Sequence, residues 1–210
     1  MTVTRIQPIS NNRYRIYTDD RVFCVLYKNE LAAYDIAEGK IITEELCAQI
    51  KAEVLTKRAR LRAMNLLMKH SFTEHKLREK LIEGGYPDDI VDDAVDYVVG
   101  YGYVDDHAYA RDYIVSHSQD KSIRRLVSDL RNKGVSADII NEVLDEVNGT
   151  IDAVDEESQI RRLLAKRRFD IAQADPQTVS KTCAYLTGRG YGMDVIRRVL
   201  RGISDDDYQA

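Results

Sequence analysis

The chain has 210 residues, of which 44% are apolar and 31% charged, and its formal net charge is −4. With only 3 prolines and 11 glycines, this balance indicates a folded, mainly helical protein and excludes both a disordered chain and a uniformly basic nucleic-acid-binding protein. No apolar run approaches the roughly 20 residues that cross a bilayer, and no hydrophobic signal core opens the chain, so we expect a cytoplasmic protein without a membrane partner.

The β-strand signals come first, within residues 1–54. Arg13–Tyr17 has alternating polar and apolar residues, and Val22–Tyr27 is a β-branched and aromatic run. The sequence Thr18-Asp19-Asp20 between them is typical of a turn, so a β-hairpin is predicted, with a short strand near Val3–Gln7 beside it. Because two strands alone are marginally stable in water, the hairpin must pack on a helix.

From Lys28 onward the spacing of the apolar residues is helical. Lys28–Ile36 predicts a short helix that ends before Gly39. Thr43 is a good N-cap for the next helix, and the apolar residues after it keep helical spacing as far as Ser71. A single helix of that length would span about 40 Å, so a break is expected near Lys57–Arg60, where cations cluster.

Three segments of the helical part align with one another. They begin at Lys76, Arg125 and Lys181, and each has the same residue types at the same offsets. The aligned positions are Leu81, Leu130 and Leu186, then Gly85, Gly134 and Gly190, then Tyr86, Val135 and Tyr191, then Asp89, Asp138 and Asp194, and last Val95, Leu144 and Leu200. Chance similarity among helical hairpins is the alternative, but a shared Gly and a shared Asp in all three segments disfavour it.

Each segment predicts a helix, a glycine turn and a second helix. The glycine ends the first helix with a positive φ, the next residue plugs the core, and an amphipathic helix follows. A third stretch with helical apolar spacing precedes each pair, at residues 60–69, 105–117 and 155–168, so the unit is three helices used three times. The predicted domains are an N-terminal region at 1–54, repeat 1 at 55–104, repeat 2 at 105–149, repeat 3 at 150–204 and an acidic tail at 205–210.

Motifs that carry catalytic or metal chemistry are missing. The 4 histidines lack helical i, i+4 spacing, and the acidic pairs at 88–89, 92–93 and 105–106 are more typical of helix starts than of a Mg²⁺ site. No phosphate-binding glycine motif and no nucleophile motif occurs, so the sequence predicts no catalytic residue, no metal site and no cofactor. We expect the three widely spaced cysteines to be small buried apolar groups in a reducing compartment; they are Cys24, Cys47 and Cys183.

Basic residues recur along the helices. One group lies at residues 57–62, and the others lie beside or within the helices of repeats 2 and 3. The predicted contact residues are Arg124, Arg125, Arg131, Lys133, Arg161, Arg162, Lys166, Arg167, Arg168, Arg197, Arg198 and Arg201. An ordinary solvated face is the alternative reading. In Arg161–Arg168, however, cations occupy five of eight positions and repel one another unless an anion compensates, as a phosphate backbone or an acidic protein surface would.

Charge and tyrosine are distributed unevenly. Residues 1–62 carry +3, residues 63–149 carry −7, residues 150–203 carry +3 and the tail carries −3, which suggests a partner contacted by separate segments. Five tyrosines lie close together, and their helical spacing favours core packing over base stacking. They are Tyr97, Tyr101, Tyr103, Tyr109 and Tyr113.

The stretches Gly100–Ile114, Ser122–Ser136 and Tyr185–Arg201 resemble the bacterial RecX family, which regulates the RecA recombinase. The resemblance covers roughly residues 55–203, and the first stretch is its most specific part. It implies three tandem three-helix repeats in an elongated, curved array, after a small N-terminal β-hairpin and helix. Two positions depart from the family pattern: Thr73–Lys76 replaces a Ser-x-x-Glu capping box, and Ser122 stands where Gly is common.

The resemblance also implies a function. It points to binding within the groove of the RecA–single-stranded-DNA filament and to inhibition of filament growth, strand exchange and ATP hydrolysis, in recombination, DNA repair and the SOS response. We expect a monomeric, non-enzymatic regulator whose partners are the RecA filament and single- or double-stranded DNA. One alternative is a helical DNA-binding module that acts without RecA, although the negative net charge argues against it. Another is an enzyme using the acidic pairs, which would need metal-dependent turnover.

Overall fold

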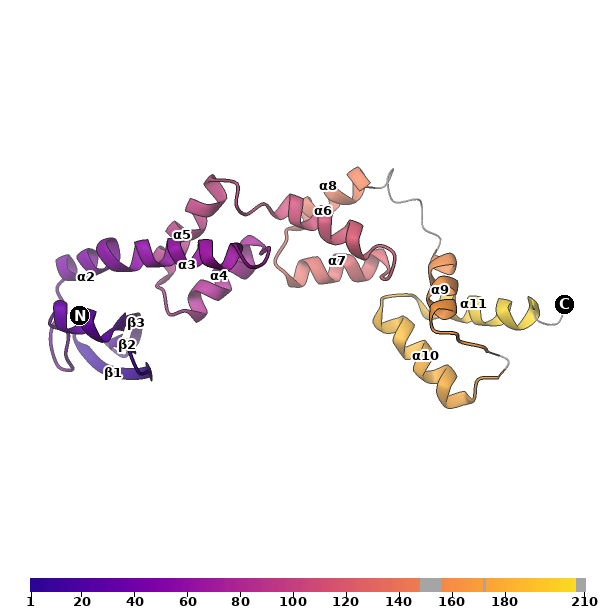
Figure 1. Cartoon of the computed structure of the whole chain (residues 1–210), viewed down its shortest axis with the longest axis horizontal. Helices are drawn as coiled ribbons and strands as arrows, with labels where there is room; N and C mark the ends of the chain where they lie inside the picture. The colour runs from indigo at the N-terminus through magenta and orange to yellow at the C-terminus, as the bar shows by residue number, and fades with distance from the viewer. Residues whose placement is uncertain (148–155, 172, 207–210) are drawn as a thin grey trace. The chain divides into compact units, whose positions relative to one another are not determined.

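The computed structural model describes residues 1–147, 156–171 and 173–206 and shows a small sheet followed by helices (Figure 1). The chain divides into two compact units, residues 1–105 and 106–210. The first unit contains the sheet and one helical repeat, and the second contains two further repeats. The predicted mainly α architecture with a small N-terminal β part is confirmed. The predicted domain boundaries stay predictions.

The N-terminal sheet has three antiparallel strands in the order β1-β2-β3. They are β1 (Val3–Ser10), β2 (Arg13–Thr18) and β3 (Arg21–Tyr27). Asp19 and Asp20 turn the chain between β2 and β3 with φ values of 48° and 61°, which Asp tolerates better than most residues and which a tight hairpin turn requires. Ile16 of β2 pairs with Ile6 of β1 and with Cys24 of β3, so the hairpin and its third strand are confirmed.

A long helix follows the sheet, and the predicted break within it is wrong. After α1 (Lys28–Ala33), the chain runs through α2 (Glu44–Ile50), a π-helical turn η1 (Lys51–Leu55) and α3 (Thr56–Leu67) without leaving helical geometry. The clustered cations are tolerated because carboxylates on other elements compensate them. Arg58 Nη1 lies 2.9 Å from Glu30 Oε2, and Arg60 Nε lies 2.8 Å from Asp93 Oδ1. The irregularity falls one turn earlier, at η1.

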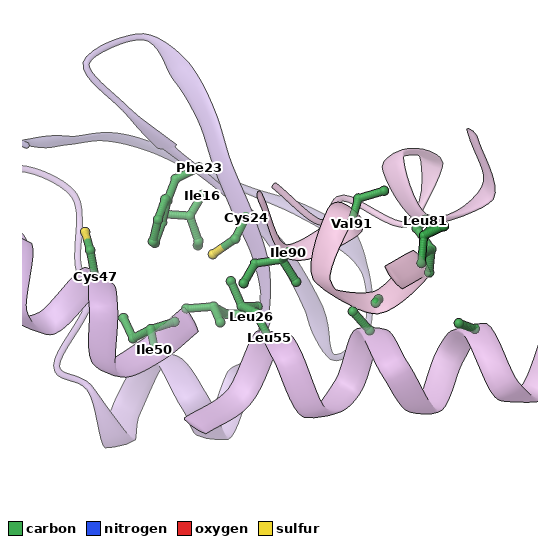
Figure 2. Packing of buried hydrophobic residues seen from close by; sticks show 14 of the residues in the cluster. Ile16, Phe23, Cys24, Leu26, Cys47, Ile50, Leu55, Leu81, Ile90 and Val91 are labelled. Atoms are coloured by element: carbon green, nitrogen blue, oxygen red, sulfur yellow. The ribbon is translucent and has the colours of Figure 1, made fainter. Parts of the chain in front are cut away.

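The sheet packs on the α2–η1–α3 helix, and together they bury the core of the first unit. Figure 2 shows Ile16, Cys24 and Leu26 of the sheet pointing toward Ile50 and Leu55 of the helix, all of them fully buried. Ile90, Val91 and Leu81 of repeat 1 continue the same core beside the sheet residues (Figure 2), so the sheet and repeat 1 share one hydrophobic interior. This shared core supplies the helix packing that a small sheet needs in water.

Two of the three cysteines match their predicted role. Cys24 and Cys47 are buried in the core of the first unit, and burial raises the pKa of the Cys24 thiol to about 12. That thiol therefore stays protonated and unreactive at physiological pH. Cys183 is only half-buried, so the expectation of full burial is wrong for this residue.

Each repeat consists of three helices. Repeat 1 is α3, α4 (Glu74–Glu83) and α5 (Asp88–Gly100); repeat 2 is α6 (Asp106–His117), α7 (Ile123–Asn132) and α8 (Ala137–Val147); repeat 3 is α9 (Glu156–Lys166), α10 (Pro176–Gly188) and α11 (Met193–Asp206). Repeats 2 and 3 each have a separate core. Leu81, Leu130 and Leu186, which share one aligned position, are all fully buried. The threefold use of a three-helix unit is confirmed.

The aligned glycines end the first helix of each pair, as predicted. Gly85, Gly134 and Gly190 have φ values of 85°, 83° and 92°. Two of these turns also lie close to the part of the chain that precedes their repeat. A Cβ on Gly85 would overlap Val25 of strand β3, and a Cβ on Gly190 would overlap Ser122 of repeat 2. Glycine therefore serves both the backbone conformation and the close approach at these two positions.

A buried polar network joins repeats 2 and 3 within the second unit. Gln159 Nε2 on α9 donates to the Ser118 carbonyl oxygen at 2.6 Å, and the Tyr191 hydroxyl donates to Gln159 Oε1 at 3.0 Å. Gln159 is 5% exposed and Tyr191 is 2% exposed, so neither can turn to water instead. Nearby, Arg189 Nη1 donates to the Asp120 carbonyl oxygen at 2.7 Å.

Replacing Gln159 with Leu is expected to destabilise repeat 3 by about 2–4 kcal/mol, because the Ser118 carbonyl and the Tyr191 hydroxyl both lose their buried partner. Hydrogen exchange of the α9–α11 amides is the suitable measurement, since a chain with several cores does not unfold in one step. Adding Tyr191→Phe removes one orphaned group, so the double variant should recover part of the loss. Unchanged exchange in Gln159→Leu would show that the network adds no stability.

Candidate partner-binding surface

The predicted contact residues of repeat 2 divide into two kinds. Arg124 and Arg131 of α7 are exposed, and no salt bridge joins either to a carboxylate in the part of the chain that the structure describes. Arg125 Nε instead lies 2.9 Å from Asp129 Oδ1, and Lys133 Nζ lies over two tyrosine rings of α6, at 5.6 and 5.3 Å from their centroids. Arg124 and Arg131 are thus the members of this set that face solvent without an internal carboxylate.

Asp129 organises the polar contacts between α6 and α7. Its Oδ2 accepts hydrogen bonds from Lys121 Nζ at 2.8 Å and from the Tyr113 hydroxyl at 3.0 Å, while Arg125 pairs with Oδ1. Burial alone would raise the pKa of Asp129, but these hydrogen bonds and the charges of Lys121 and Arg125 hold it below its ordinary value. Arg125 therefore acts mainly within the fold. Sequence reasoning had not identified Lys121, because its partner is neither a neighbour in the chain nor on the same helix.

Three of the five cations in residues 161–168 project from α9 into solvent. Arg161, Arg162 and Lys166 are exposed, on the side opposite the buried Ile160 and Leu163. Arg162 Nη1 donates to the side-chain oxygen of Gln119 in repeat 2, a neutral partner. Within the described residues no carboxylate forms a salt bridge with these three cations. The described residues therefore supply no carboxylate that compensates the charges of Arg161, Arg162 and Lys166.

The other two cations of this segment border a cavity of about 480 Å³ between the end of α9 and helix α10. The Arg167 guanidinium carbon lies 4.0 Å from the centroid of the Tyr185 ring. Asp170 and Asp175 line the same cavity as Arg167, Arg168 and Lys181, so two carboxylates offset two of its three cationic charges. Asp175 also caps α10, because its Oδ1 accepts a backbone N–H of the first turn at 2.6 Å.

One ion pair brings the cations of α9 and α11 together. Arg198 Nη1 on α11 lies 2.8 Å from Glu157 Oε1 on α9. Arg161 is four residues after Glu157 and Arg201 three residues after Arg198, so both lie on the same side of their helices as the pair. We call the exposed set Arg161, Arg197, Arg198 and Arg201 the α9–α11 basic face. Residues far apart in the sequence thus form one cationic surface.

The tyrosine prediction is wrong for two of five residues. Tyr101 and Tyr103 are 65% and 53% exposed, with ring centroids 6.1 Å apart. Both lie beyond the end of α5, where Gly102 has a φ of 71° and the helical periodicity stops. Tyr97, Tyr109 and Tyr113 are half-buried against the cores of their repeats, which agrees with the prediction.

In the part of the chain that the structure describes, no three His, Cys, Asp or Glu side chains gather in a way that could hold a metal ion. No described helix is long and apolar enough to cross a membrane.

Three-helix units in tandem, each packed around buried apolar residues, define a helical-repeat protein. Models of three RecX domains match these units one by one: the first three-helix domain at residues 59–97, the second at 105–144 and the third at 155–200. The chain belongs to the RecX family, as its sequence motifs indicated.

Proteins similar to this chain are named regulatory protein RecX. A regulatory protein RecX from Chromobacterium violaceum is 30% identical over 152 residues, which cover 72% of this chain and 95% of the relative. Another, from Clostridioides difficile, is 26% identical over 211 residues and covers 98% of this chain and 97% of the relative. A crystal structure of regulatory protein RecX has a TM-score of 0.55 at 23% identity, covering 94% of this chain and 98% of its own. A crystal structure of RecX from Lactobacillus salivarius has a TM-score of 0.51 at 16% identity, and the match covers 71% of this chain and 97% of that chain. Both structures share the fold.

Proposed function

We propose that this protein binds the RecA filament on single-stranded DNA and restrains its growth, and with it strand exchange and ATP hydrolysis. The observation that carries the proposal is the α9–α11 basic face, in a chain that belongs to the RecX family of regulatory proteins. A polymer of protein and nucleic acid offers repeated carboxylates and phosphates. These are the groups that arginine guanidinium binds best, through paired hydrogen bonds.

Repeats with separate cores suit a repetitive partner. Exposed cations occur on α7, α9 and α11, so several weak contacts can form at once, and each bound repeat raises the effective concentration of the next. Charge attraction of this kind mainly increases the association rate and makes binding sensitive to salt. Occupation of the filament by such a protein obstructs addition of further RecA subunits without any catalytic step.

The proposal predicts that Arg161→Gln/Arg201→Gln raises the concentration needed for half-maximal inhibition of RecA by about tenfold or more, since each lost charge-assisted contact contributes on the order of 1 kcal/mol. ATP turnover and filament length on single-stranded DNA are the measurements. The matched control is Arg21→Gln/Arg111→Gln, which removes the same charge from exposed positions outside the predicted contact set.

Three results would contradict the proposal. Wild-type protein at stoichiometric amounts could leave ATP turnover and filament length unchanged. Both double variants could shift inhibition equally, which would implicate net charge instead of the α9–α11 basic face. Finally, the protein could bind DNA tightly with a steep salt dependence while failing to associate with RecA, which would favour an independent DNA-binding module.

A further inference from the structure

The first unit contains a polar pocket of about 440 Å³ between the sheet and repeat 1. Its walls come from the start of β2, the end of β3, helix α3, the last turn of α4 and the turn after it. The lining residues are Arg13, Tyr27, Arg62, Lys80, Glu83, Gly84 and Tyr86. A pocket of this volume is in the range that accommodates a small organic ligand. None of these residues belongs to the surface assigned above to RecA.

The pocket has an excess of positive charge. Three of its lining side chains are cationic and one is anionic, and that one, Glu83, is held by Lys80 at 2.7 Å. Arg13 Nη2 donates to the Gly84 carbonyl oxygen at 3.2 Å, which fixes its guanidinium at the wall without neutralising it. Arg62 is exposed, and no salt bridge joins it to a carboxylate in the described residues. Arg13 and Arg62 thus leave two positive charges facing an open volume in a protein whose net charge is −4.

Two aromatic rings line the same pocket and are held in place from behind. A narrow recess that shares Arg13 and both tyrosines with the pocket extends inward to Arg58. The Arg58 guanidinium carbon lies 4.9 Å from the Tyr27 ring centroid and 5.9 Å from that of Tyr86. Glu30 neutralises Arg58 at 2.9 Å, so this arginine supports the rings and does not compete for an anion. Tyr27 remains 37% exposed.

We propose that this pocket binds a nucleotide, with the phosphate between Arg13 and Arg62 and the base against Tyr27. Arg13 and Tyr27 are cross-strand neighbours in the sheet, and Arg62 of α3 lines the same pocket. Cations close to an exposed ring match a ligand that carries a charged phosphate and a flat ring a few ångströms apart. The same chemistry is found in a free nucleotide and in one unit of a single strand, where stacking on tyrosine is tolerant of sequence. The inference goes beyond the RecA-binding function and requires no RecA.

Calorimetric titration of the full chain at low ionic strength tests the pocket directly. The probes are thymidine monophosphate, thymidine, inorganic phosphate and a short oligothymidylate. Thymidine monophosphate is expected to bind saturably and more tightly than either thymidine or phosphate alone, because it engages the cations and the tyrosine ring at the same time. Tighter binding of the oligonucleotide would identify a strand as the source of the ligand, whereas equal binding would identify the free nucleotide; either result supports the pocket.

Two substitutions locate the binding. Arg62→Gln is expected to weaken thymidine monophosphate about tenfold, the usual effect of losing one charge-assisted contact. Arg21→Gln removes the same charge from the far end of β3 and should change binding less than twofold. Tyr27→Leu should abolish the advantage of thymidine monophosphate over phosphate while leaving phosphate binding unchanged. Circular dichroism spectra matching the wild type confirm that each variant is folded.

The inference is overturned if thymidine monophosphate shows no saturable binding, or if Arg21→Gln and Arg62→Gln weaken it equally. These titrations contain no RecA, so their failure leaves the filament proposal standing. Conversely, loss of RecA inhibition in the Arg161→Gln/Arg201→Gln variant with intact nucleotide binding separates the two sites.

Discussion

Gly190→Ala is expected to lower the stability of repeat 3 by about 2–4 kcal/mol, combining the cost of a left-handed backbone for Ala with that of overpacking. Gly190 has a φ of 92°. A Cβ there would overlap Ser122 Oγ and lie 2.6 Å from Arg125 Cβ and 3.1 Å from the Arg125 backbone nitrogen. Because backbone atoms cannot give way as a flexible side chain would, the turn must move away from repeat 2.

The control for this variant lies two residues earlier. Gly188 is the last residue of α10, it has no atom within 4 Å of a built Cβ, and its φ is not positive. Gly188→Ala is therefore expected to stabilise the helix by about 0.5–1 kcal/mol, the opposite sign. Hydrogen exchange measures the stability of both variants. The amides to follow are those of repeat 3 and that of Ser122, which donates to the Arg189 carbonyl at 3.1 Å. Equal effects of the two substitutions would refute the close-approach argument.

Gly85→Ala is expected to destabilise the first unit by a similar amount, about 2–4 kcal/mol, for the equivalent reason in a different setting. Gly85 has a φ of 85°, and a Cβ there would overlap Val25 Cγ2 on β3. The contact joins the turn of repeat 1 to the sheet, so the change should loosen the sheet from repeat 1. Protection of the β3 amides against hydrogen exchange should fall along with thermal stability.

Gly102→Ala separates the cost of the left-handed backbone from the cost of the close contact. Gly102 also has a positive φ, 71°, but no atom lies within 4 Å of a built Cβ, so its substitution costs only the backbone term, about 1–2 kcal/mol. Adding Val25→Ala to Gly85→Ala removes the overlapping methyl group and should recover part of the excess loss. If Gly85→Ala and Gly102→Ala unfold at the same temperature, the contact with Val25 has no energetic role.

These two glycines show how one motif serves several modules. In repeat 1 the glycine turn contacts the sheet, and in repeat 3 it contacts repeat 2. The glycine that ends a helix therefore also lets the sheet, in repeat 1, or repeat 2, in repeat 3, approach the turn closely. A substitution at either position is expected to alter the placement of neighbouring modules as well as the turn itself, and hence the placement of any binding face they carry.

Local sequence patterns determined most of the elements. The Asp19-Asp20 turn, the positive φ of the aligned glycines and the burial of Leu81, Leu130 and Leu186 follow from steric limits and helical periodicity, which act over a few residues. The triplicated three-helix unit and the family assignment followed from the same short-range signals. The curvature of the repeat array and the roles of individual cations stay predictions.

Only the tertiary structure decided which charged groups are compensated. The break expected near Lys57–Arg60 is absent because Glu30 and Asp93, which are remote in the chain, pair with the cations there. Likewise Arg198 meets Glu157 across 41 residues, and Arg13 reaches the Gly84 carbonyl across 71. Short-range sequence patterns specify the backbone conformation. The electrostatic energy of a charged side chain depends instead on the groups around it in space. For these residues, those groups come from distant parts of the chain.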